Sequence, residues 1–262
     1  MSATNEVVKI VSSSAGILHI SLNRPEQLNA LNQDVLKRLD QLFLDAAHDK
    51  SVKAILLTGE GKAFCAGADI KQLAALDGAE GLAFARFGQA VFRHLELAGK
   101  PSVAAIQGYT FGGGCELAMA ATLRIAANNA VFGQPEIKLG VIPGFGGTQR
   151  LSRLIGKGRA LEICLTGRRF SAEEAFKWGL VNEITTPENL LERAKALLNE
   201  LAGLGPVALQ SILSVIHQGY DLSLEEAFEL EAAHFGLCCT TADKREGVNA
   251  FLEKRAAVFS GA

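Results

Sequence analysis

The chain has 262 residues, enough for one large domain or for a domain with an appendage. Because 48% of the residues are hydrophobic, a substantial core is available and disorder is not expected. The formal net charge of −2 argues against nucleic acid as the main partner, since phosphate binding needs a concentrated basic surface, but it leaves room for a small anionic ligand.

The five cysteines are scattered and form no CxxC motif, so the sequence predicts reduced thiols in a cytoplasmic protein and no metal site. They are Cys65, Cys115, Cys164, Cys238 and Cys239. The first ten residues, MSATNEVVKI, lack the basic and apolar regions of a secretory signal. No apolar run approaches the roughly 18 residues of a membrane span, so none is expected.

The first part of the chain alternates short apolar runs with turns and helical patterns. Strands are expected at 7–11 and 17–22, joined by a hairpin turn over the intervening SSSAG. Helical spacing of apolar residues predicts a helix over 33–48, and the run AILLT predicts a buried strand at 54–58.

The middle of the chain continues this alternation. Residues 70–98 have a helical pattern that a glycine-containing interruption divides near 77–81. The segment SVAAIQ predicts a second buried strand at 102–107. Two further short strands are expected at 123–126 and 130–132.

From about residue 146 onward the pattern is mainly helical. Capping-box sequences predict helix starts at Ser171 and Ser223, and Pro187 and Pro206 stand where helices are expected to begin. One last strand is expected at 181–185. The final helices need a surface for their apolar stripes, and we expect a subunit interface there.

Several motifs of nucleophilic, metal-dependent and nucleotide-binding enzymes are missing from the sequence. There is no GxSxG, no HExxH, no GxxxxGK[ST] and no GxGxxG after a strand. The five histidines are dispersed and are expected to be ordinary surface or core residues. Carboxylates and backbone amides are therefore the candidate chemical groups.

The stretch FGGGCELAMAA, residues 111–121, places one carboxylate, Glu116, in a short helix that is otherwise apolar on every side. Most helical glutamates are solvated, but a helix that is apolar all round is normally buried. A buried carboxylate shifts its pKa or finds a partner, and a glutamate with a raised pKa suits general acid–base catalysis near neutral pH. Glu116 is therefore a candidate catalytic residue.

Two other segments supply groups of the same kind. Ala68 ends the small-residue turn AFCAGAD after a buried strand, where backbone N–H groups are exposed, and Gly113 lies near a helix N-terminus, where N–H groups are unpaired. Glu136 follows Pro135 in a segment rich in glycine and apolar residues. Two amide donors and two carboxylates suit chemistry next to a carbonyl, where the donors hold an enolate oxygen and the carboxylates move protons.

Over essentially its full length the sequence resembles the enoyl-CoA hydratase/isomerase (crotonase) superfamily. The resemblance rests on NRPEQLNALN (23–32), GKAFCAGADIK (61–71), IQGYTFGGGCELA (106–118), FGQPEIKLGVIPGFGGTQRL (132–151), LTGRRFSAEEAFKWGLVNE (165–183) and DKREGVNAFLEKR (243–255). Within the superfamily, GGGCE together with GQPE is most similar to the hydratases.

The resemblance implies an α/β fold, a crotonase-type spiral of ββα units with a helical C-terminal region that forms trimers. It divides the chain into a catalytic core over 1–200 and a helical oligomerisation region over 201–262. The expected assembly is a homotrimer or a dimer of trimers.

The resemblance also implies roles at the site. The amides of Ala68 and Gly113 would form the oxyanion hole for a thioester carbonyl. Glu116 and Glu136 would hold the water that adds to the double bond, with Glu136 as the expected donor of the α-proton. The backbone at Gly144 would help to place that water.

Five further positions match residues that contact the coenzyme A part of the substrate. Asp69, Ile70 and Lys71 match residues beside this moiety. Phe235 and Lys254 match C-terminal residues that reach it, in the family often across a subunit boundary.

The sequence thus predicts an enoyl-CoA hydratase of the fatty-acid β-oxidation type, which turns trans-2-enoyl-CoA and water into 3-hydroxyacyl-CoA without a metal or other cofactor. A Δ3-Δ2 enoyl-CoA isomerase or another crotonase chemistry is the first alternative, although an isomerase needs only one of the two glutamates. A non-catalytic binding protein, for RNA for example, is the second, and the acidic charge and intact site argue against it. The acyl-chain length stays open, with Phe84, Phe87 and Phe92 as candidates for the acyl end.

Overall fold

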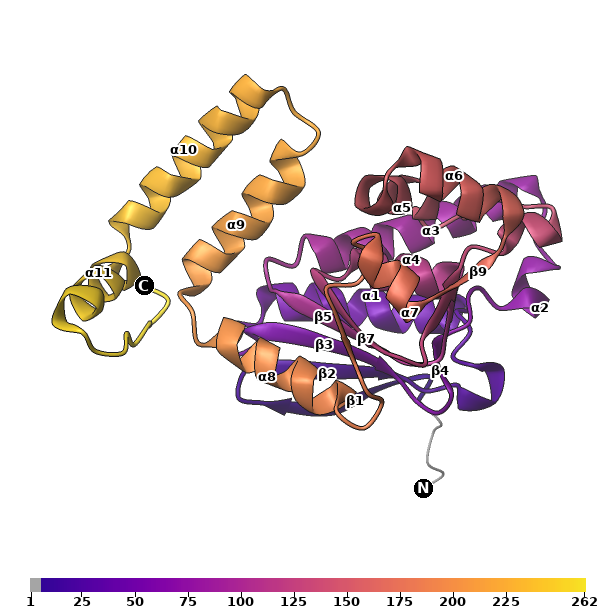
Figure 1. Cartoon of the computed structure of the whole chain (residues 1–262), viewed down its shortest axis with the longest axis horizontal. Helices are drawn as coiled ribbons and strands as arrows, with labels where there is room; N and C mark the ends of the chain where they lie inside the picture. Colours follow the sequence, from indigo (N-terminus) through magenta and orange to yellow (C-terminus); the bar gives the residue numbers. More distant parts are fainter. Residues whose placement is uncertain (1–5) are drawn as a thin grey trace.

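The computed structural model describes residues 6–262, which form a layered α/β body with a helical extension at the C-terminus (Figure 1). The larger of its two sheets has six strands in the order β1-β2-β3-β5-β7-β10. β1 and β2 are antiparallel, whereas each later neighbouring pair is parallel. The strands are β1 (Val8–Ser14), β2 (Ile17–Leu22), β3 (Ala54–Gly59), β5 (Ser102–Ile106), β7 (Leu123–Ala127) and β10 (Glu183–Thr185).

Alternate residues of the buried strands face two separate cores. In β3, Ile55 belongs to the larger core, which α1 (Gln33–His48) and α3 (Gly78–Glu96) cover. Leu56 points the other way and packs with α8 (Leu190–Ala202). Because both faces of the strand are buried, its sequence reads as a continuous apolar run.

A second sheet consists of four strands of three residues each, in the order β4-β6-β8-β9. They are β4 (Ala63–Cys65), β6 (Tyr109–Phe111), β8 (Val131–Gly133) and β9 (Arg169–Ser171). The sequence predicted only β8 among them, because a period of two is not visible in so short a run.

The two sheets share a repeating unit of two strands and a helix, which confirms the predicted ββα spiral. β3 and β4 precede α2 (Ile70–Leu73), β5 and β6 precede α4 (Gly113–Ala120), and β7 and β8 precede the 3-10 helix η2 (Glu136–Leu139). In each unit the first strand joins the large sheet and the second joins the small one. The site segments of the sequence therefore all follow strands of the small sheet.

Most helix starts agree with their sequence signals. Asn32 caps α1 by accepting a hydrogen bond from Val35 N–H. Capping boxes at Asp77, Ser171 and Ser223 start α3, α7 (Ala172–Lys177) and α10 (Leu224–Thr240). The remaining elements of the body are η1 (Pro25–Gln27), α5 (Gly147–Ile155), α6 (Lys157–Thr166) and α7 (Ala172–Lys177).

Two local predictions are wrong. The backbone of β1 continues through Ser14, so the hairpin turn is confined to Ala15 and Gly16, both of which have positive φ. Pro187 does not begin a helix, because α8 starts three residues later at Leu190, whereas Pro206 occupies the first turn of its helix as expected.

The C-terminal helices extend away from the body. α9 (Pro206–Gly219) and α10 (Leu224–Thr240) lie side by side as a helical hairpin. α11 (Ala242–Glu253) follows α10 at the end of the hairpin opposite the turn between α9 and α10 (Figure 1). No single helix within 6–262 is long and apolar enough to cross a membrane; α8 and α9 meet that criterion only as a pair bent by 106°. The division at residues 200 and 201 stays a prediction, and residues 1–5, with the start of the predicted core, lie outside the described part.

Candidate active site

Glu116 lies in α4, all eight residues of which are buried. β6 enters this helix through Gly112, whose φ of 48° favours glycine. A Cβ at Gly114 would lie 2.1 Å from the carbonyl oxygen of Cys65, so only glycine lets the helix pack this closely on β4. The glycines thus bring the helix into the core, and Glu116, at 1% exposure, is buried with it.

Two backbone amides of the loop before α5 hold the Glu116 carboxylate. The N–H groups of Phe145 and Gly147 both donate to Oε1, at 2.8 and 2.5 Å. A Cβ on Gly147 would lie 2.8 Å from the same oxygen, so the loop must carry glycine there. Among the described residues no donor reaches Oε2.

Glu136 lies in η2, and its side chain extends to the start of α4, near Glu116. Its Oε1 would lie 2.4 Å from a Cβ on Gly112, so this carboxylate sits at the start of α4. Gln134 is completely buried and, with its amide nitrogen toward Glu136, donates to both carboxylate oxygens at 3.1 and 3.2 Å. The Gln134 amide also lies 2.8 Å from the Cβ position of Gly147, beside Glu116 Oε1, and therefore stands between the two glutamates.

Burial raises the pKa of both carboxyl groups. The pKa of Glu116 rises to about 8, because its charge is removed from water and faces that of Glu136, although the two amide donors act in the opposite direction. Burial raises the pKa of Glu136 to about 7. Two neighbouring carboxyls titrate as a pair, so the pair holds one proton in the neutral range.

The predicted oxyanion donors, the backbone N–H groups of Ala68 and Gly113, lie at two adjacent turns. Leu31 N–H donates to Gly67 O and Asp69 N–H donates to Leu31 O, so the N–H of Ala68, between them, points away from Leu31. Gly113 is the first residue of α4, where an N–H has no acceptor within the helix. A Cβ on Gly67 would lie 3.8 Å from Gly113 N, so the two turns are adjacent.

Gly144 lies in the loop that holds Glu116. Its carbonyl oxygen accepts a hydrogen bond from Gln89 Nε2 at 2.8 Å, and its neighbour Phe145 donates to Glu116. The position is thus beside the carboxylate, and its role in placing a water stays a prediction.

The geometry brings together two backbone amides and two buried carboxyls whose pKa values are raised. Such an arrangement stabilises negative charge on a carbonyl oxygen while one carboxylate accepts a proton and the other carboxyl donates one. The sequence pattern of the family described as enoyl-CoA hydratase/isomerase matches residues 12–262. The chain belongs to the enoyl-CoA hydratase/isomerase family.

Individual relatives are similar over nearly their whole length. The short-chain-enoyl-CoA hydratase of Clostridium acetobutylicum is 43% identical over 247 residues, which are 94% of this chain and 95% of the relative. The crotonyl-CoA hydratase of Syntrophomonas wolfei is 44% identical over 239 residues, 91% and 92% of the two chains. The crystal structure of an enoyl-CoA hydratase from Bacillus anthracis, 35% identical, superposes with a TM-score of 0.94 over 98% of this chain and 100% of that one.

Three of the predicted coenzyme A positions directly follow the amide of Ala68. Asp69 caps α2 by accepting from Lys71 N–H at 3.1 Å, and its other oxygen accepts from Arg24 at 2.9 Å. Both oxygens of this carboxylate therefore already accept hydrogen bonds from other parts of the chain. Ile70, at 56% exposure, and Lys71 are open to solvent.

The other two predicted positions lie far from α4 within one chain. Phe235 is on α10 and Lys254 ends α11, both beyond the body of the molecule (Figure 1). Both are exposed. A single copy of the chain does not bring them to the glutamates, so a contact with substrate there requires a second copy.

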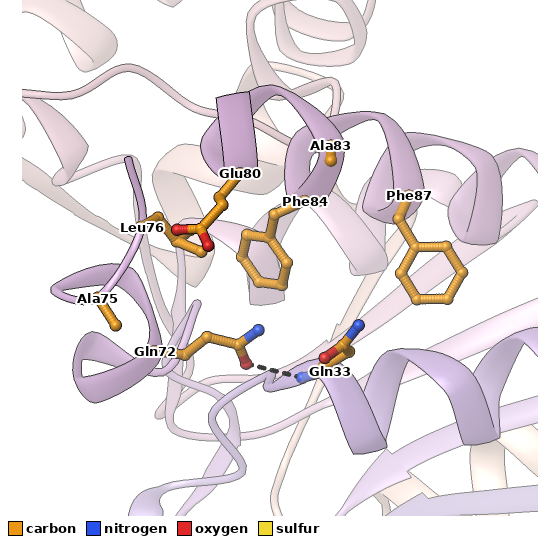
Figure 2. A pocket seen from close by; sticks show the side chains of 8 residues that line it. All are labelled: Gln33, Gln72, Ala75, Leu76, Glu80, Ala83, Phe84 and Phe87. Carbon is orange, nitrogen blue, oxygen red and sulfur yellow. Dashed lines mark hydrogen bonds between the residues drawn. The ribbon is translucent and has the colours of Figure 1, made fainter. Parts of the chain in front are cut away.

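A cavity of about 510 Å³ opens between α1, α2 and α3 (Figure 2). Phe84 and Phe87 of α3 point into it, facing Gln72 and Gln33, which are joined by a hydrogen bond of 2.8 Å. The ring of Phe84 packs edge-on against the ring of Phe145, with 5.1 Å between the ring centroids. The wall of this cavity is therefore in contact with the loop beside Glu116. Two of the three phenylalanines suggested for the acyl end thus line this cavity, and their contact with an acyl chain stays a prediction.

The third of these phenylalanines, Phe92, does not line this cavity. Phe92 is fully buried and packs against Phe145 rather than lining the cavity. Sequence reasoning also missed the donors Phe145 and Gly147 and the buried amide of Gln134. The glycines of GFGGT and the Gln of GQPE were the available signals, but a backbone donor has no residue type of its own.

Proposed function

We propose that this chain hydrates trans-2-enoyl-CoA thioesters with Glu116 and Glu136 acting as one acid–base pair. Its family membership and its 43% and 44% identity to hydratases over most of its length support enoyl-CoA hydratase activity. The observation that carries the proposal for the site is the pair of buried glutamates, from α4 and η2, next to the amides of Ala68 and Gly113.

In the proposed step the thioester oxygen accepts hydrogen bonds from Ala68 N–H and Gly113 N–H. The reactive form of the pair is the one that carries its single proton on Glu136. Ionised Glu116 removes a proton from water as the water oxygen bonds to C3, and the C2–C3 π electrons move toward the thioester as an enolate. Protonated Glu136 then gives its proton to C2. The net change is addition of one water, and proton exchange with solvent returns the pair to its starting state.

The second carboxylate distinguishes hydration from double-bond isomerisation. Moving a double bond requires one group to remove a proton and return it, whereas hydration also needs a group to activate water. Glu116 has two backbone donors and an oxygen without a donor among the described residues, which suits the activation of water.

The activity is tested with purified protein and a panel of trans-2-enoyl-CoAs of increasing chain length. Hydration is followed as loss of the absorbance of the conjugated enoyl thioester, and the product is identified by mass as substrate plus water. A 3-enoyl-CoA run in parallel tests isomerisation. Conversion of the 3-enoyl substrate without hydration of any 2-enoyl substrate would contradict the proposal.

We further propose a homotrimer, or a dimer of trimers, built by α9–α11. These helices expose many large apolar side chains, a surface that one copy leaves uncovered. They include Ile212, Ile216, Leu224, Phe228, Phe235, Leu237, Phe251 and Leu252. Such an assembly would carry Phe235 and Lys254 to the substrate of a neighbouring copy.

The proposed setting is fatty-acid β-oxidation in the cytoplasm. Free thiols at all five cysteines are compatible with a reducing compartment. In that setting the substrate comes from a reaction that introduces the 2,3 double bond, and the product passes to an oxidation of its 3-hydroxyl group.

A further inference from the structure

The loop that holds Glu116 is fastened on its other side by an arginine. In α5, Arg150 donates from Nη1 to the carbonyl oxygen of Phe145 at 2.8 Å and from Nε to Oε1 of Glu96 at 2.5 Å. Phe145 itself donates its N–H to Glu116. One residue is thus bonded on one side to the acid–base pair and on the other to an ion pair between α5 and α3.

Gly146 makes room for this arginine. Its φ is 103°, and a Cβ there would lie 2.3 Å from Nη1 of Arg150. A glycine in this conformation leaves the backbone with few steric limits. The bond from Arg150 therefore fixes the loop between Phe145 and Gly147, the two residues whose amides reach Glu116.

The ion pair behind the loop is well anchored. The side chains of Arg150 and Glu96 are only 16% and 10% exposed, and Arg93 also donates to Glu96 at 3.1 Å. Burial raises the pKa of Glu96, but the hydrogen bonds from Arg150 and Arg93 outweigh this effect and hold the pKa below its usual value. Glu96 is therefore ionised and keeps the guanidinium in place.

The charge of Arg150 acts on Glu116 as well as on the loop. It lowers the pKa of Glu116, in opposition to burial and to the charge of Glu136. The other titratable groups facing this assembly are Glu136 on η2, Cys115 on α4, Cys164 on α6, Arg93 and Glu96 on α3, and His217 on α9. Loss of the Arg150 cation is therefore expected to disfavour ionised Glu116.

We propose that Arg150, anchored by Glu96, is a positioning residue for hydration that fixes the 145–147 loop so that both amides reach Glu116. It acts through Glu116 and not on the substrate. The proposal rests on the proposed function, and the two fail differently. A wild-type protein without hydratase activity would contradict the proposed function. A dispensable Arg150 would contradict only the positioning role, because wild-type hydration would be intact.

The position of Arg150 permits chemical rescue. Arg150 borders a cavity of about 750 Å³ between α3, α5 and α9, open toward solvent. Replacing the side chain with alanine would enlarge this cavity next to Phe145 and Glu96. Guanidinium from solution can then occupy the space that the side chain left.

The experiment measures kcat, KM and their pH dependence for crotonyl-CoA hydration. Arg150→Ala is expected to lower kcat by about 10- to 100-fold with little change in KM, because the base is misplaced while the substrate contacts remain. The acidic limb of the kcat profile should move to higher pH, since ionised Glu116 has lost a favourable cation. Guanidinium at millimolar, non-denaturing concentration should restore part of kcat, and potassium chloride at equal ionic strength should not.

Arg150→Lys keeps the charge but lacks the planar fork, so it should keep the acidic limb near the wild-type position with a partial loss of kcat. Arg153→Ala is the matched control, because Arg153 lies on the same helix and cavity but pairs with exposed Asp221 at 3.3 Å. It should leave both kcat and the pH profile unchanged.

A folded Arg150→Ala variant with wild-type kcat and pH profile would overturn the proposal. So would a loss of kcat with an unshifted profile and no rescue, which indicates a structural role alone. Circular dichroism and light scattering establish folding and assembly. If Arg150→Ala does not fold, Glu96→Gln is used, for which the same direction of change is expected; wild-type kcat and profile in that variant would overturn the proposal equally.

Discussion

The surroundings of α4 differ from the helices α9–α11 in how completely one copy of the chain buries apolar side chains and pairs polar groups. At α4 even a buried carboxylate has two backbone donors, and eight consecutive residues are buried. On α9–α11, by contrast, Phe235 and Phe251 are 71% and 83% exposed. Because burial of apolar surface is the main stabilising term in folding and association, the extension has a surface suited to a partner. In our account one region performs the proton chemistry and the other assembles copies around it.

The largest expected effect concerns Glu136. Glu136→Gln keeps the shape of the side chain but cannot deliver a proton to C2, so kcat should fall by ~10²–10⁴. The double variant with Glu116→Gln should be little worse than either single variant, since the two act as a unit. If the two losses multiplied instead, the glutamates would be independent groups and the paired mechanism would be wrong.

Removal of an oxyanion donor should cost slightly less. Gly113→Pro deletes the N–H that we propose donates to the thioester oxygen, with an expected loss of ~10²–10³ in kcat. Gly113→Ala is the control, because it keeps the N–H and adds a Cβ that meets Leu31 and Phe145 at 3.1 Å. A Pro variant that folds, by circular dichroism, and turns over no more slowly than the Ala variant would remove Gly113 from the oxyanion hole.

A charge on the extension tests the other half of the comparison. Phe228 on α10 is 58% exposed, and Phe228→Asp should weaken assembly because a carboxylate is costly to bury at an interface. Light scattering should report a lower mass than for wild type, and KM should rise about tenfold if contacts worth about 1.4 kcal/mol are lost. The exposed neighbour Glu229→Ala is the control. A wild-type protein that is a fully active monomer would contradict the assembly role.

Asp69 should give the smallest effect, because it supports the fold next to the site. Asp69→Ala removes the cap of α2 and the bond to Arg24, so the free energy of unfolding should fall by about 1 kcal/mol in urea denaturation. Asp69→Asn can still cap and should lose less. A rise in KM with unchanged stability would instead assign this carboxylate to coenzyme A.

Sequence patterns predicted the fold best where an element is long and its ends carry their own signals. Residues 33–48 form α1 as expected, because helical spacing and the Asn32 cap agree. Three strands of the small sheet were missed, because each has three residues and depends on pairing with distant strands. At Pro187 the reason is local, because a turn in which Asn189 N–H donates to Thr186 O precedes the helix.

At the site, sequence reasoning identified the two glutamates but missed the groups that donate hydrogen bonds to them. Glu116 was a candidate because it lies in an apolar helix, and the structure buries it. Its closeness to Glu136 could come only from the family resemblance, since the two lie on separate elements. The hydrogen bonds from Phe145 N–H to Glu116 and from Arg150 to Phe145 O both involve the backbone of Phe145. Backbone geometry of this kind is indicated in the sequence only by the glycines at 146 and 147.

The most direct test of the central claim is the pH dependence of crotonyl-CoA hydration by wild type and by Glu116→Gln. Activity should fall below about pH 7 as the pair takes up a second proton and above about pH 8 as it loses its only proton, because hydration needs one carboxylate and one carboxyl, and this gives a bell-shaped profile. Glu116→Gln should lower the maximum by ~10²–10⁴ and abolish the acidic limb. Hydration by Glu116→Gln at the wild-type rate, with the bell unchanged, would contradict the two-glutamate mechanism.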